Sequence, residues 1–83
     1  MAEVIIYSKN NCPYCVRAKN LFKSKNVVFK EINVEGDDKL YNELKQKTGL
    51  MTVPQIFING NLIGGYSDLQ ALDDDGKLDP LLK

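Results

Sequence analysis

The feature that most constrains the fold is a short apolar run, Glu3–Ser8, followed closely by a cysteine pair and a helix-like segment. The run EVIIYS is rich in β-branched residues and is typical of a strand that is buried on both faces. The next segment begins CPYC, which places Pro13 at the first position of a helix, where its missing N–H group would have had no partner. Apolar residues then recur at helical spacing, at Cys15, Ala18, Leu21 and Phe22. The chain is therefore expected to begin with a strand and an amphipathic helix.

A second strand and a second helix are expected next. The run VVFKEINV predicts a strand over Val27–Val34. Because a helix joins it to the first strand, the two strands should be parallel with a right-handed crossover. Asp37 and Asp38 suit the start of a helix, where acids interact favourably with the helix dipole. This helix is expected over roughly Asp38–Thr48 and should end at Gly49.

The last third of the chain carries a hairpin signal and then a helix signal. Gln55–Ile58 and Asn61–Ile63 predict two strands joined at Asn59-Gly60, a dipeptide that is typical of tight hairpins. Ser67, with Gln70 three residues later, matches a capping box and predicts the start of a third helix. The final LDPLLK predicts a short turn or helix.

The order of these segments, β-α-β-α-β-β-α, predicts a single α/β domain over residues 1–83. It would contain a mixed four-stranded sheet with helices on both faces. No apolar run approaches the length of a membrane span. The N-terminal segment carries no basic leader, and its apolar run is too short for a signal peptide. We therefore expect a cytoplasmic protein without membrane attachment.

Charge is divided unevenly along the sequence, although the net charge is zero. Residues 1–30 contain six basic side chains and one acid, whereas residues 31–83 contain five basic side chains and ten acids. A nucleic-acid-binding domain is usually basic overall, so no nucleic-acid partner is expected. The basic first part fits a solvated helix face. It also fits a positive field beside the cysteines, which would attract anions and favour a thiolate.

Cys12 is expected at the N-cap of the first helix, directly before Pro13. A residue that precedes proline is pushed toward extended dihedral angles, which an N-cap requires. Its sulfur could then accept hydrogen bonds from the N–H groups of Tyr14 and Cys15. The positive end of the helix dipole adds to this stabilisation of a thiolate, and Lys9 could contribute a further positive charge. Cys12 is therefore the expected nucleophile.

Cys15 lies one turn later on the apolar stripe, so it should be more buried and suited to resolving a disulfide formed on Cys12. A structural disulfide would be unusual in a cytosolic chain and would close a very short loop. A zinc site needs four ligands, and the chain has two cysteines and no histidine. Two inert thiols are a further alternative. The lack of histidine also excludes a cysteine hydrolase that uses histidine as its base. A CxxC pair beside a βαβ pattern favours redox chemistry.

These segments together resemble the glutaredoxin family, and the resemblance spans nearly the whole chain. It rests on four motifs in order, which are CPYC, TVPQIFI, GGYSDL and LDPLL. The small size and the ending are most similar to the short bacterial dithiol members. The resemblance implies the thioredoxin fold, with sheet order 4-3-1-2 and the third strand antiparallel to the others. It also implies a cis peptide bond between Val53 and Pro54.

The same resemblance implies a glutathione site across the cysteines, the segment before the hairpin and the start of the third helix. Its residues would be Lys9, Tyr14, Thr52, Val53, Pro54, Gly65, Ser67 and Asp68. The N–H groups of Ser67 and Asp68 would bind the γ-glutamyl carboxylate, because helix N-termini favour anions. The Asp68 side chain would take the α-ammonium group of glutathione.

Gly65 and Lys9 would make further contacts with glutathione in this implied site. Gly65 would let the backbone approach the ligand closely, and Lys9 would bind the glycyl carboxylate. The alternatives are a dipole-favoured acid at Asp68 and a solvated Lys9. Before the TVP motif the chain has Leu50 and Met51, where relatives often carry a basic or polar residue. No side-chain contact to glutathione is expected from that position.

The resemblance implies a glutathione-dependent thiol–disulfide oxidoreductase. Cys12 would attack a protein disulfide or a protein–glutathione mixed disulfide. Cys15 would resolve the protein mixed disulfide and leave a Cys12–Cys15 disulfide, which glutathione would reduce. Glutathione is then a co-substrate. No tightly bound cofactor or metal is expected, and the protein should act as a monomer on disulfide-containing or glutathionylated proteins.

Two alternative functions stay open at this point. In the first, a dimer would hold a 2Fe–2S cluster through Cys12 and two glutathione molecules, as some relatives do. The rigid Pro13 argues against this alternative. In the second, the cysteine pair would do thioredoxin-type work driven by a flavoprotein reductase.

Overall fold

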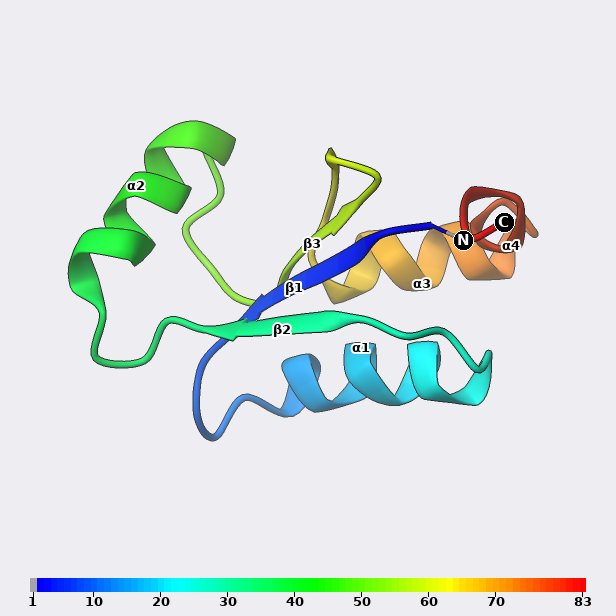
Figure 1. The fold of residues 1–83 in the computed structure, drawn as a ribbon, viewed down its shortest axis with the longest axis horizontal. Helices are drawn as coiled ribbons and strands as arrows, with labels where there is room; N and C mark the ends of the chain where they lie inside the picture. The colour runs from blue at the N-terminus through cyan, green and yellow to red at the C-terminus, as the bar shows by residue number, and fades with distance from the viewer. Residues whose placement is uncertain (1) are drawn as a thin grey trace.

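A mixed four-stranded sheet organises the protein in the computed structural model, which describes residues 2–83 (Figure 1). In chain order the elements are β1 (Val4–Ser8), α1 (Pro13–Ser24), β2 (Lys30–Asn33), α2 (Asp38–Thr48), β3 (Gln55–Ile58), β4 (Asn61–Gly64), α3 (Tyr66–Asp74) and α4 (Leu78–Leu81). Of the helices in these residues, none combines the length and the apolar composition that crossing a bilayer would require.

The order of strands across the sheet is β2-β1-β3-β4. β1 is parallel to β2, and β3 is antiparallel to both β1 and β4. The predicted order 4-3-1-2, with the third strand antiparallel to the others, is therefore confirmed. The register pairs Ser8 with Asn33 and Tyr7 with Gln55. The end of β1 thus lies beside the start of β3, and the loops that adjoin these two strand ends meet at one end of the sheet.

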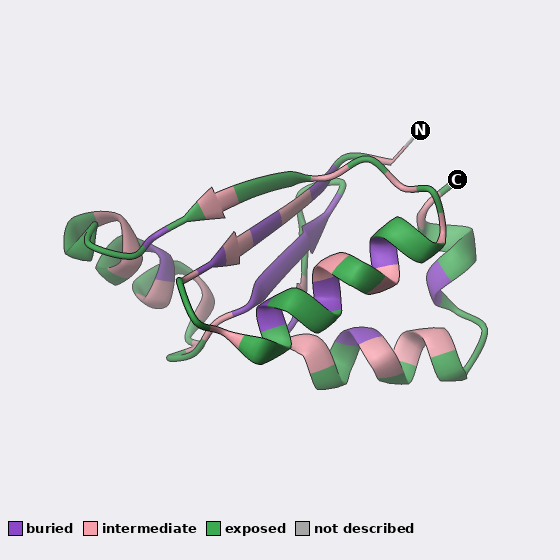
Figure 2. Ribbon diagram, turned by 90° about the horizontal axis from the view of Figure 1, so that it is seen from below, coloured by how far each residue is buried: buried purple, intermediate pink, exposed green. Residues whose placement is uncertain are grey.

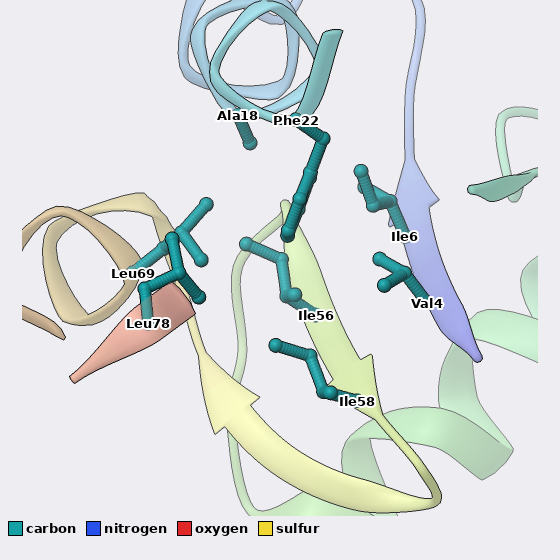
Figure 3. Close-up of a cluster of buried hydrophobic side chains, with 8 residues drawn as sticks. All are labelled: Val4, Ile6, Ala18, Phe22, Ile56, Ile58, Leu69 and Leu78. Atoms are coloured by element: carbon teal, nitrogen blue, oxygen red, sulfur yellow. The ribbon is translucent and has the colours of Figure 1, made fainter. Parts of the chain in front are cut away.

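The main core lies between the sheet and the helices α1, α3 and α4. Figure 2 shows α1 and α3 along the same face of the sheet, with α2 apart from them. The buried cluster consists of Val4, Ile6, Ala18, Phe22, Ile56, Ile58, Leu69 and Leu78 (Figure 3). Removing an aliphatic or aromatic side chain of this size from water stabilises a fold by about 1.5–3 kcal/mol. These contacts fix α1, and with it the cysteine pair, against the sheet.

On the opposite face of the sheet, α2 packs at the end where the loops before β3 and after β1 meet. Phe57 points to this face because side chains alternate along a strand, and the Nζ of Lys47 on α2 lies 5.7 Å from the centre of its ring. The Thr48 hydroxyl at the end of α2 donates a hydrogen bond to the Gln55 side chain. Leu44 is the buried apolar residue of this helix. Helices therefore lie on both faces, as predicted, although α2 contacts only one end of its face.

Two strand predictions needed correction. β1 is not buried on both faces, because Val4 and Ile6 are buried while Ile5 and Tyr7 are only half-buried. β3 is the strand whose residues are all buried. β2 begins at Lys30 rather than Val27. The register explains most of this shortening. Lys30 pairs with Ile5, the second residue of β1, so Val27 and Val28 lie opposite residues that precede β1.

Candidate active site

Cys12 is the N-cap of α1, as predicted, and adopts an extended backbone with φ −110° and ψ 99°. Its sulfur accepts a hydrogen bond from the Cys15 N–H at 3.2 Å. The predicted second bond, from the Tyr14 N–H, is not formed, because the cap geometry directs the sulfur to the third helical N–H only. The N-cap position and the helix dipole favour negative charge on this sulfur.

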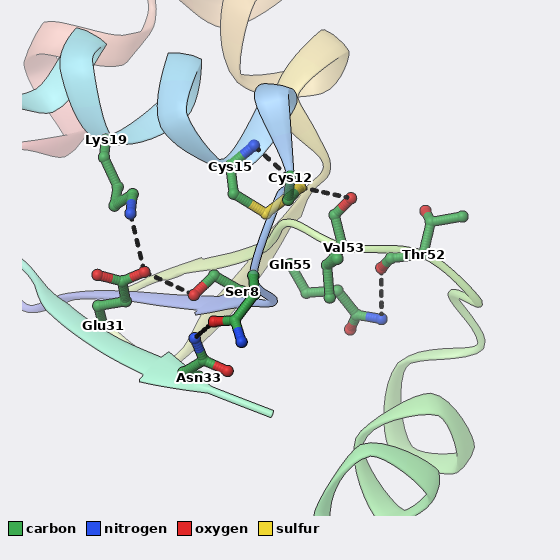
Figure 4. Close-up of a disulfide and its surroundings, with 10 residues drawn as sticks. Ser8, Cys12, Cys15, Lys19, Glu31, Asn33, Thr52, Val53 and Gln55 are labelled. Atoms are coloured by element: carbon green, nitrogen blue, oxygen red, sulfur yellow. Dashed lines mark hydrogen bonds and ion pairs between the residues drawn. A yellow bond between two sulfur atoms is a disulfide. The ribbon is translucent and has the colours of Figure 1, made fainter. Parts of the chain in front are cut away.

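The two cysteines form a disulfide, with their Cα atoms 5.2 Å apart (Figure 4). Cys15 is 1% exposed, whereas Cys12 is half-buried. The predicted inequality of the two sulfurs is therefore present in the fold. One sulfur can be reached by a partner, and the other lies beneath it on the core side of the helix. Within residues 2–83, no group of three or more His, Cys, Asp and Glu side chains is arranged to hold a metal ion.

The segment before β3 faces the cysteines across the end of the sheet. The Val53–Pro54 peptide bond is cis, and the Cys12 sulfur lies 3.9 Å from the Val53 carbonyl oxygen. Figure 4 shows the Val53 carbonyl group beside Cys12, with Thr52 on the side of Val53 away from the disulfide. The site therefore joins the first third of the chain to a segment some forty residues later, as the 41-residue separation of Cys12 and Val53 shows.

Gln55 holds the segment before β3 in place. This role was not predicted from the sequence. Gln55 is fully buried. Its side-chain nitrogen donates to the carbonyl oxygens of Leu50 at 3.0 Å and Thr52 at 3.1 Å, and its oxygen accepts from the Thr48 hydroxyl at 2.9 Å. One amide thus ties the end of α2 to the loop that reaches Val53. A polar residue at the start of the otherwise apolar run QIFI was the available signal.

Replacing Gln55 with methionine should weaken both stability and the site. Methionine matches glutamine in length but leaves the carbonyl oxygens of Leu50 and Thr52 without this donor. Leaving a buried polar group unpaired costs about 1–3 kcal/mol, so we expect a loss of that size in the free energy of unfolding. Urea denaturation measures this loss directly. If Gln55→Met had the same free energy of unfolding as the wild type, the amide would not be needed to hold the loop.

A groove lies beside the cysteines and gathers most of the predicted glutathione-binding residues. It is lined by Tyr14, Thr52, Val53, Pro54, Gly65, Tyr66 and Ser67. Tyr66 was given no role from the sequence. Its ring centre lies 6.0 Å from that of Tyr14, and its hydroxyl donates to the Gln70 side chain at 2.8 Å. The two rings form one aromatic wall of the groove, which only the folded chain brings together.

The N-terminus of α3 differs from the sequence prediction. The helix begins at Tyr66 with Gly65 as its N-cap, so Ser67 is the second helical residue and does not form a capping box with Gln70. Instead the Asp68 carboxylate accepts a hydrogen bond from the Gly65 N–H at 3.0 Å. The helix starts earlier than predicted because this contact satisfies the backbone one turn before Asp68. The N–H groups of Ser67 and Asp68 stay in the first turn, where a helix offers donors to an anion.

The position of the Asp68 carboxylate requires glycine at position 64. This requirement was not predicted from the sequence. The φ of Gly64 is +121°, a backbone conformation that side chains rarely adopt, and a Cβ atom there would collide with the Asp68 carboxylate. Gly65 differs, since its φ is −92° and a Cβ atom would make only an ordinary contact of 3.6 Å with the Pro54 carbonyl oxygen. Of the two glycines, Gly64 is thus the one that the fold itself needs.

Lys9 lies against α2 on the other side of Cys12. Its Nζ lies 4.2 Å from the centre of the Tyr41 ring, and the Nζ of Lys45 lies 4.5 Å from the same centre. The Tyr41 hydroxyl donates to the Met51 carbonyl oxygen at 2.8 Å. Tyr41 was not identified from the sequence. It places two positive charges beside the segment that leads to Val53, through a cation–π contact with each lysine.

A second hollow lies on the Cys15 side of α1. Its lining includes both cysteines together with Lys9, Lys19 and Glu31. The Glu31 carboxylate accepts hydrogen bonds from the Ser8 hydroxyl at 2.6 Å and from the Lys19 ammonium at 2.9 Å. These two hydrogen bonds hold the pKa of the Glu31 carboxyl below its usual value. Glu31 is therefore ionised at neutral pH beside the cysteine pair.

A family model and related sequences that match this chain are glutaredoxins. The family model described as glutaredoxin matches residues 4–63. Glutaredoxin 3 of Escherichia coli is 53% identical over 83 residues, which cover 100% of both chains. A glutaredoxin of Pseudomonas aeruginosa is 50% identical over 82 residues, which cover 99% of this chain and 98% of its own.

Solved structures agree with the sequence comparisons. The crystal structure of a buckwheat glutaredoxin–glutathione complex superposes with a TM-score of 0.92 at 38% identity, over 98% of this chain and 76% of that one. The solution structure of a glutaredoxin from Brucella melitensis gives a TM-score of 0.89 at 48% identity, over 100% of this chain and 90% of that one. With its thioredoxin fold and its CPYC pair at the N-terminus of α1, the chain belongs to the glutaredoxin family.

Proposed function

We propose that this glutaredoxin is a glutathione-dependent thiol–disulfide oxidoreductase. It reduces protein disulfides and protein–glutathione mixed disulfides through Cys12 and Cys15, and glutathione regenerates the dithiol. The observation that carries the proposal is the half-buried Cys12 sulfur at the N-cap of α1, bonded to the buried sulfur of Cys15. The buckwheat relative was solved as a complex with glutathione, which supports glutathione as the partner.

The reaction begins when the Cys12 thiolate attacks a disulfide of the substrate. With a glutathionylated protein, the glutathione sulfur stays on Cys12 and the protein leaves as a thiol. A second glutathione then releases the first as glutathione disulfide. With a protein disulfide, Cys15 attacks the Cys12 sulfur, the substrate leaves reduced, and two glutathione molecules reduce the Cys12–Cys15 disulfide. The helix N-terminus stabilises the Cys12 thiolate both as nucleophile and as leaving group.

Glutathione binds in the groove between Tyr14 and the start of α3. Its cysteine backbone pairs with the N–H and C=O of Val53, in the manner of an added strand. Its γ-glutamyl carboxylate takes the N–H groups of Ser67 and Asp68, and the Asp68 carboxylate takes the α-ammonium group. Val53 and Ser67 line this groove together with Thr52, Pro54 and Gly65, which supports the placement, and Asp68 follows Ser67 in the first turn of α3.

The glycyl carboxylate of glutathione lies toward Lys9. This lysine is held on the Tyr41 ring near the Met51 carbonyl oxygen, on the side of Cys12 away from α3. The positive charge of Lys45 on the same ring adds to the field at this end of the ligand. The two ends of glutathione are thus held by opposite sides of the site.

Replacing Asp68 with alanine should raise the KM for a glutathionylated peptide by about tenfold, the loss expected for one hydrogen bond to a charged group. Because the carboxylate also caps α3, the alanine variant should lose about 0.5–2 kcal/mol of stability as well. Steady-state kinetics and urea denaturation measure the two effects separately.

Asparagine at position 68 is the matched control, because it keeps the oxygen that accepts from Gly65 but removes the charge. Asp68→Asn should raise the KM as the alanine variant does, with stability close to wild type. A wild-type KM in Asp68→Asn would remove the Asp68 charge from the glutathione site.

The decisive experiment for the function is a reconstituted turnover assay. Glutathione, glutathione reductase and NADPH should sustain reduction of a glutathionylated peptide by catalytic amounts of the protein. A thioredoxin-type flavoprotein reductase in place of the glutathione system should not. Turnover only with the flavoprotein reductase would contradict the proposal.

We place this activity in the cytoplasm, since glutathione there keeps such a dithiol reduced. The reaction as written needs one chain, no metal and no tightly bound cofactor. A single monomer peak in size-exclusion chromatography, and full activity after treatment with a metal chelator, are the outcomes that this part of the proposal expects.

A further inference from the structure

Tyr41 on α2 joins two loops of the site. Its hydroxyl donates to the Met51 carbonyl oxygen at 2.8 Å, just ahead of Val53 in the chain. The centre of its ring lies 4.2 Å from the Nζ of Lys9, on the loop between β1 and α1. The same centre lies 4.5 Å from the Nζ of Lys45, one turn later on α2. The ring therefore fixes where the Lys9 ammonium group lies relative to the segment that carries Val53.

Lys9 and Lys45 carry positive charges that no acid neutralises. Both side chains are half-buried, although lysine is mostly exposed in proteins. Within residues 2–83, neither ammonium group lies within salt-bridge distance of a carboxylate. An aromatic face attracts a cation but has no net charge. Because both groups contact one ring, they are closer than the Debye length of about 10 Å at 0.1 M salt and repel each other. An anion bound beside them would relieve this repulsion.

The glycyl carboxylate of glutathione is the anion that fits this place. In the proposed function the γ-glutamyl end lies at the first turn of α3, and the cysteine backbone pairs with Val53. The Val53 carbonyl oxygen lies 3.9 Å from the Cys12 sulfur, and Lys9 lines a hollow together with Cys12. The glycyl end is the part of the ligand left to extend past Val53 toward α2. An ammonium group has three N–H donors, so Lys9 can stay on the Tyr41 ring and still donate to a carboxylate.

We propose that Tyr41 is a positioning residue, which makes the protein selective for the glycyl carboxylate by holding Lys9 in place before glutathione binds. The inference rests on the proposed function, because it concerns how glutathione-linked substrates are recognised. Ordering a free lysine side chain on binding lowers affinity, and a lysine that is already held on a ring avoids this loss. The contacts of Tyr41 are with Met51 and the two lysines. It should therefore affect binding of the substrate and not the attack by Cys12.

A comparison of two peptides tests this selectivity. Each carries a mixed disulfide, one with glutathione and the other with its glycinamide analogue, in which a neutral amide replaces the glycyl carboxylate. Reduced protein is mixed with each peptide without free glutathione, and release of the peptide thiol reports the attack by Cys12. In the wild type the second-order rate constant should be about tenfold lower for the glycinamide peptide, the loss expected for one hydrogen bond to a charged group. This ratio is the carboxylate selectivity.

Tyr41→Leu removes the ring and should reduce the carboxylate selectivity from about tenfold to about threefold, because Lys9 must then be ordered on binding. The maximal rate at saturating peptide should stay that of the wild type, because the N-cap position of Cys12 is unchanged. Tyr41→Phe keeps the ring and loses only the hydroxyl, so it should retain the wild-type selectivity. Lys9→Met has no donor for the carboxylate and should abolish the selectivity.

Lys47→Gln is the matched control. It removes an exposed positive charge from the same helix, and the Nζ of Lys47 lies 5.7 Å from the centre of a different ring, that of Phe57. This variant should keep the full carboxylate selectivity. Because the selectivity is a ratio measured on one preparation, partial unfolding or a changed Cys12 pKa would alter both rate constants alike and leave the ratio unchanged.

The outcomes distinguish the inference from the function on which it rests. Wild-type selectivity in Tyr41→Leu, with a loss in Lys9→Met, would overturn the inference and leave the proposed function standing. An equal loss in Tyr41→Phe and Tyr41→Leu would also overturn it, because the hydroxyl and not the ring would then be responsible. Failure of the wild type to release thiol from the glutathionylated peptide would contradict the proposed function itself.

Discussion

Serine in place of Cys12 is expected to abolish both the deglutathionylation of proteins and the reduction of protein disulfides. Both reactions start with attack by the Cys12 sulfur, and a serine hydroxyl is not ionised by a helix N-terminus at neutral pH. Loss of a nucleophile removes the chemical step itself, so turnover should fall by at least about 1000-fold. Release of peptide thiol from a glutathionylated peptide, and reduction of a disulfide-bonded protein, measure the two reactions.

The control for Cys12→Ser is a test that the variant is folded. Serine is also a good N-cap, so α1 should begin at the same residue and circular dichroism should match the wild-type reduced protein. The reduced protein is the right reference, because Cys12→Ser cannot form the disulfide. Residual activity of more than a few per cent of wild type would mean that Cys15 can act as the nucleophile, contrary to its burial.

Serine in place of Cys15 should instead separate the two reactions. Reduction of a protein disulfide needs a second thiol to release the substrate from Cys12, so this activity should fall by at least about 100-fold. Deglutathionylation is completed by free glutathione and should stay within about threefold of wild type. The asymmetry follows from the geometry, in which only the Cys12 sulfur is both half-exposed and at the helix N-cap.

Comparing two substrates on one preparation provides the internal control for Cys15→Ser. A buried serine could lower stability, but a loss of folded protein would reduce both activities together. Trapping the Cys12–protein mixed disulfide on non-reducing gels would show where the reaction stops. Equal losses in both reactions would contradict the separate roles of the two cysteines.

Features that depend on neighbouring residues in the chain were predicted well. Proline after Cys12 restricts its backbone, so the N-cap and the start of α1 followed from two adjacent residues. The bounds of α2 and β3 also follow from local signals, in particular Gly49, which ends α2 with a left-handed φ of 77°. The strand order was taken from the family resemblance rather than from the pattern.

Features that depend on distant residues were predicted less well. The N-cap of α3 was placed two residues late, at Ser67 instead of Gly65, because the Ser67–Gln70 spacing fits a capping box, while the actual contact is between Asp68 and Gly65. β2 was predicted too long at its start because the apolar residues Val27 and Val28 lie opposite residues that precede its partner strand β1. Gln55, Tyr41 and Glu31 each act by contacts with another element. For Gln55 its polar side chain at the start of an apolar strand was a signal, but the sequence does not indicate which residues any of the three contacts.

The pairing of Tyr7 with Gln55 determines which property of the protein is lost first when it partly unfolds. The cysteine half of the site needs only α1, whereas the Val53 half exists only while β1 and β3 stay in register. If the hairpin detached while α1 survived, the molecule would keep a reactive thiol but lose its selectivity for glutathione-linked substrates. Selectivity, rather than thiol reactivity, is therefore the sensitive indicator of an intact sheet. A partly unfolded molecule would become an indiscriminate thiol reagent before it became an inert one.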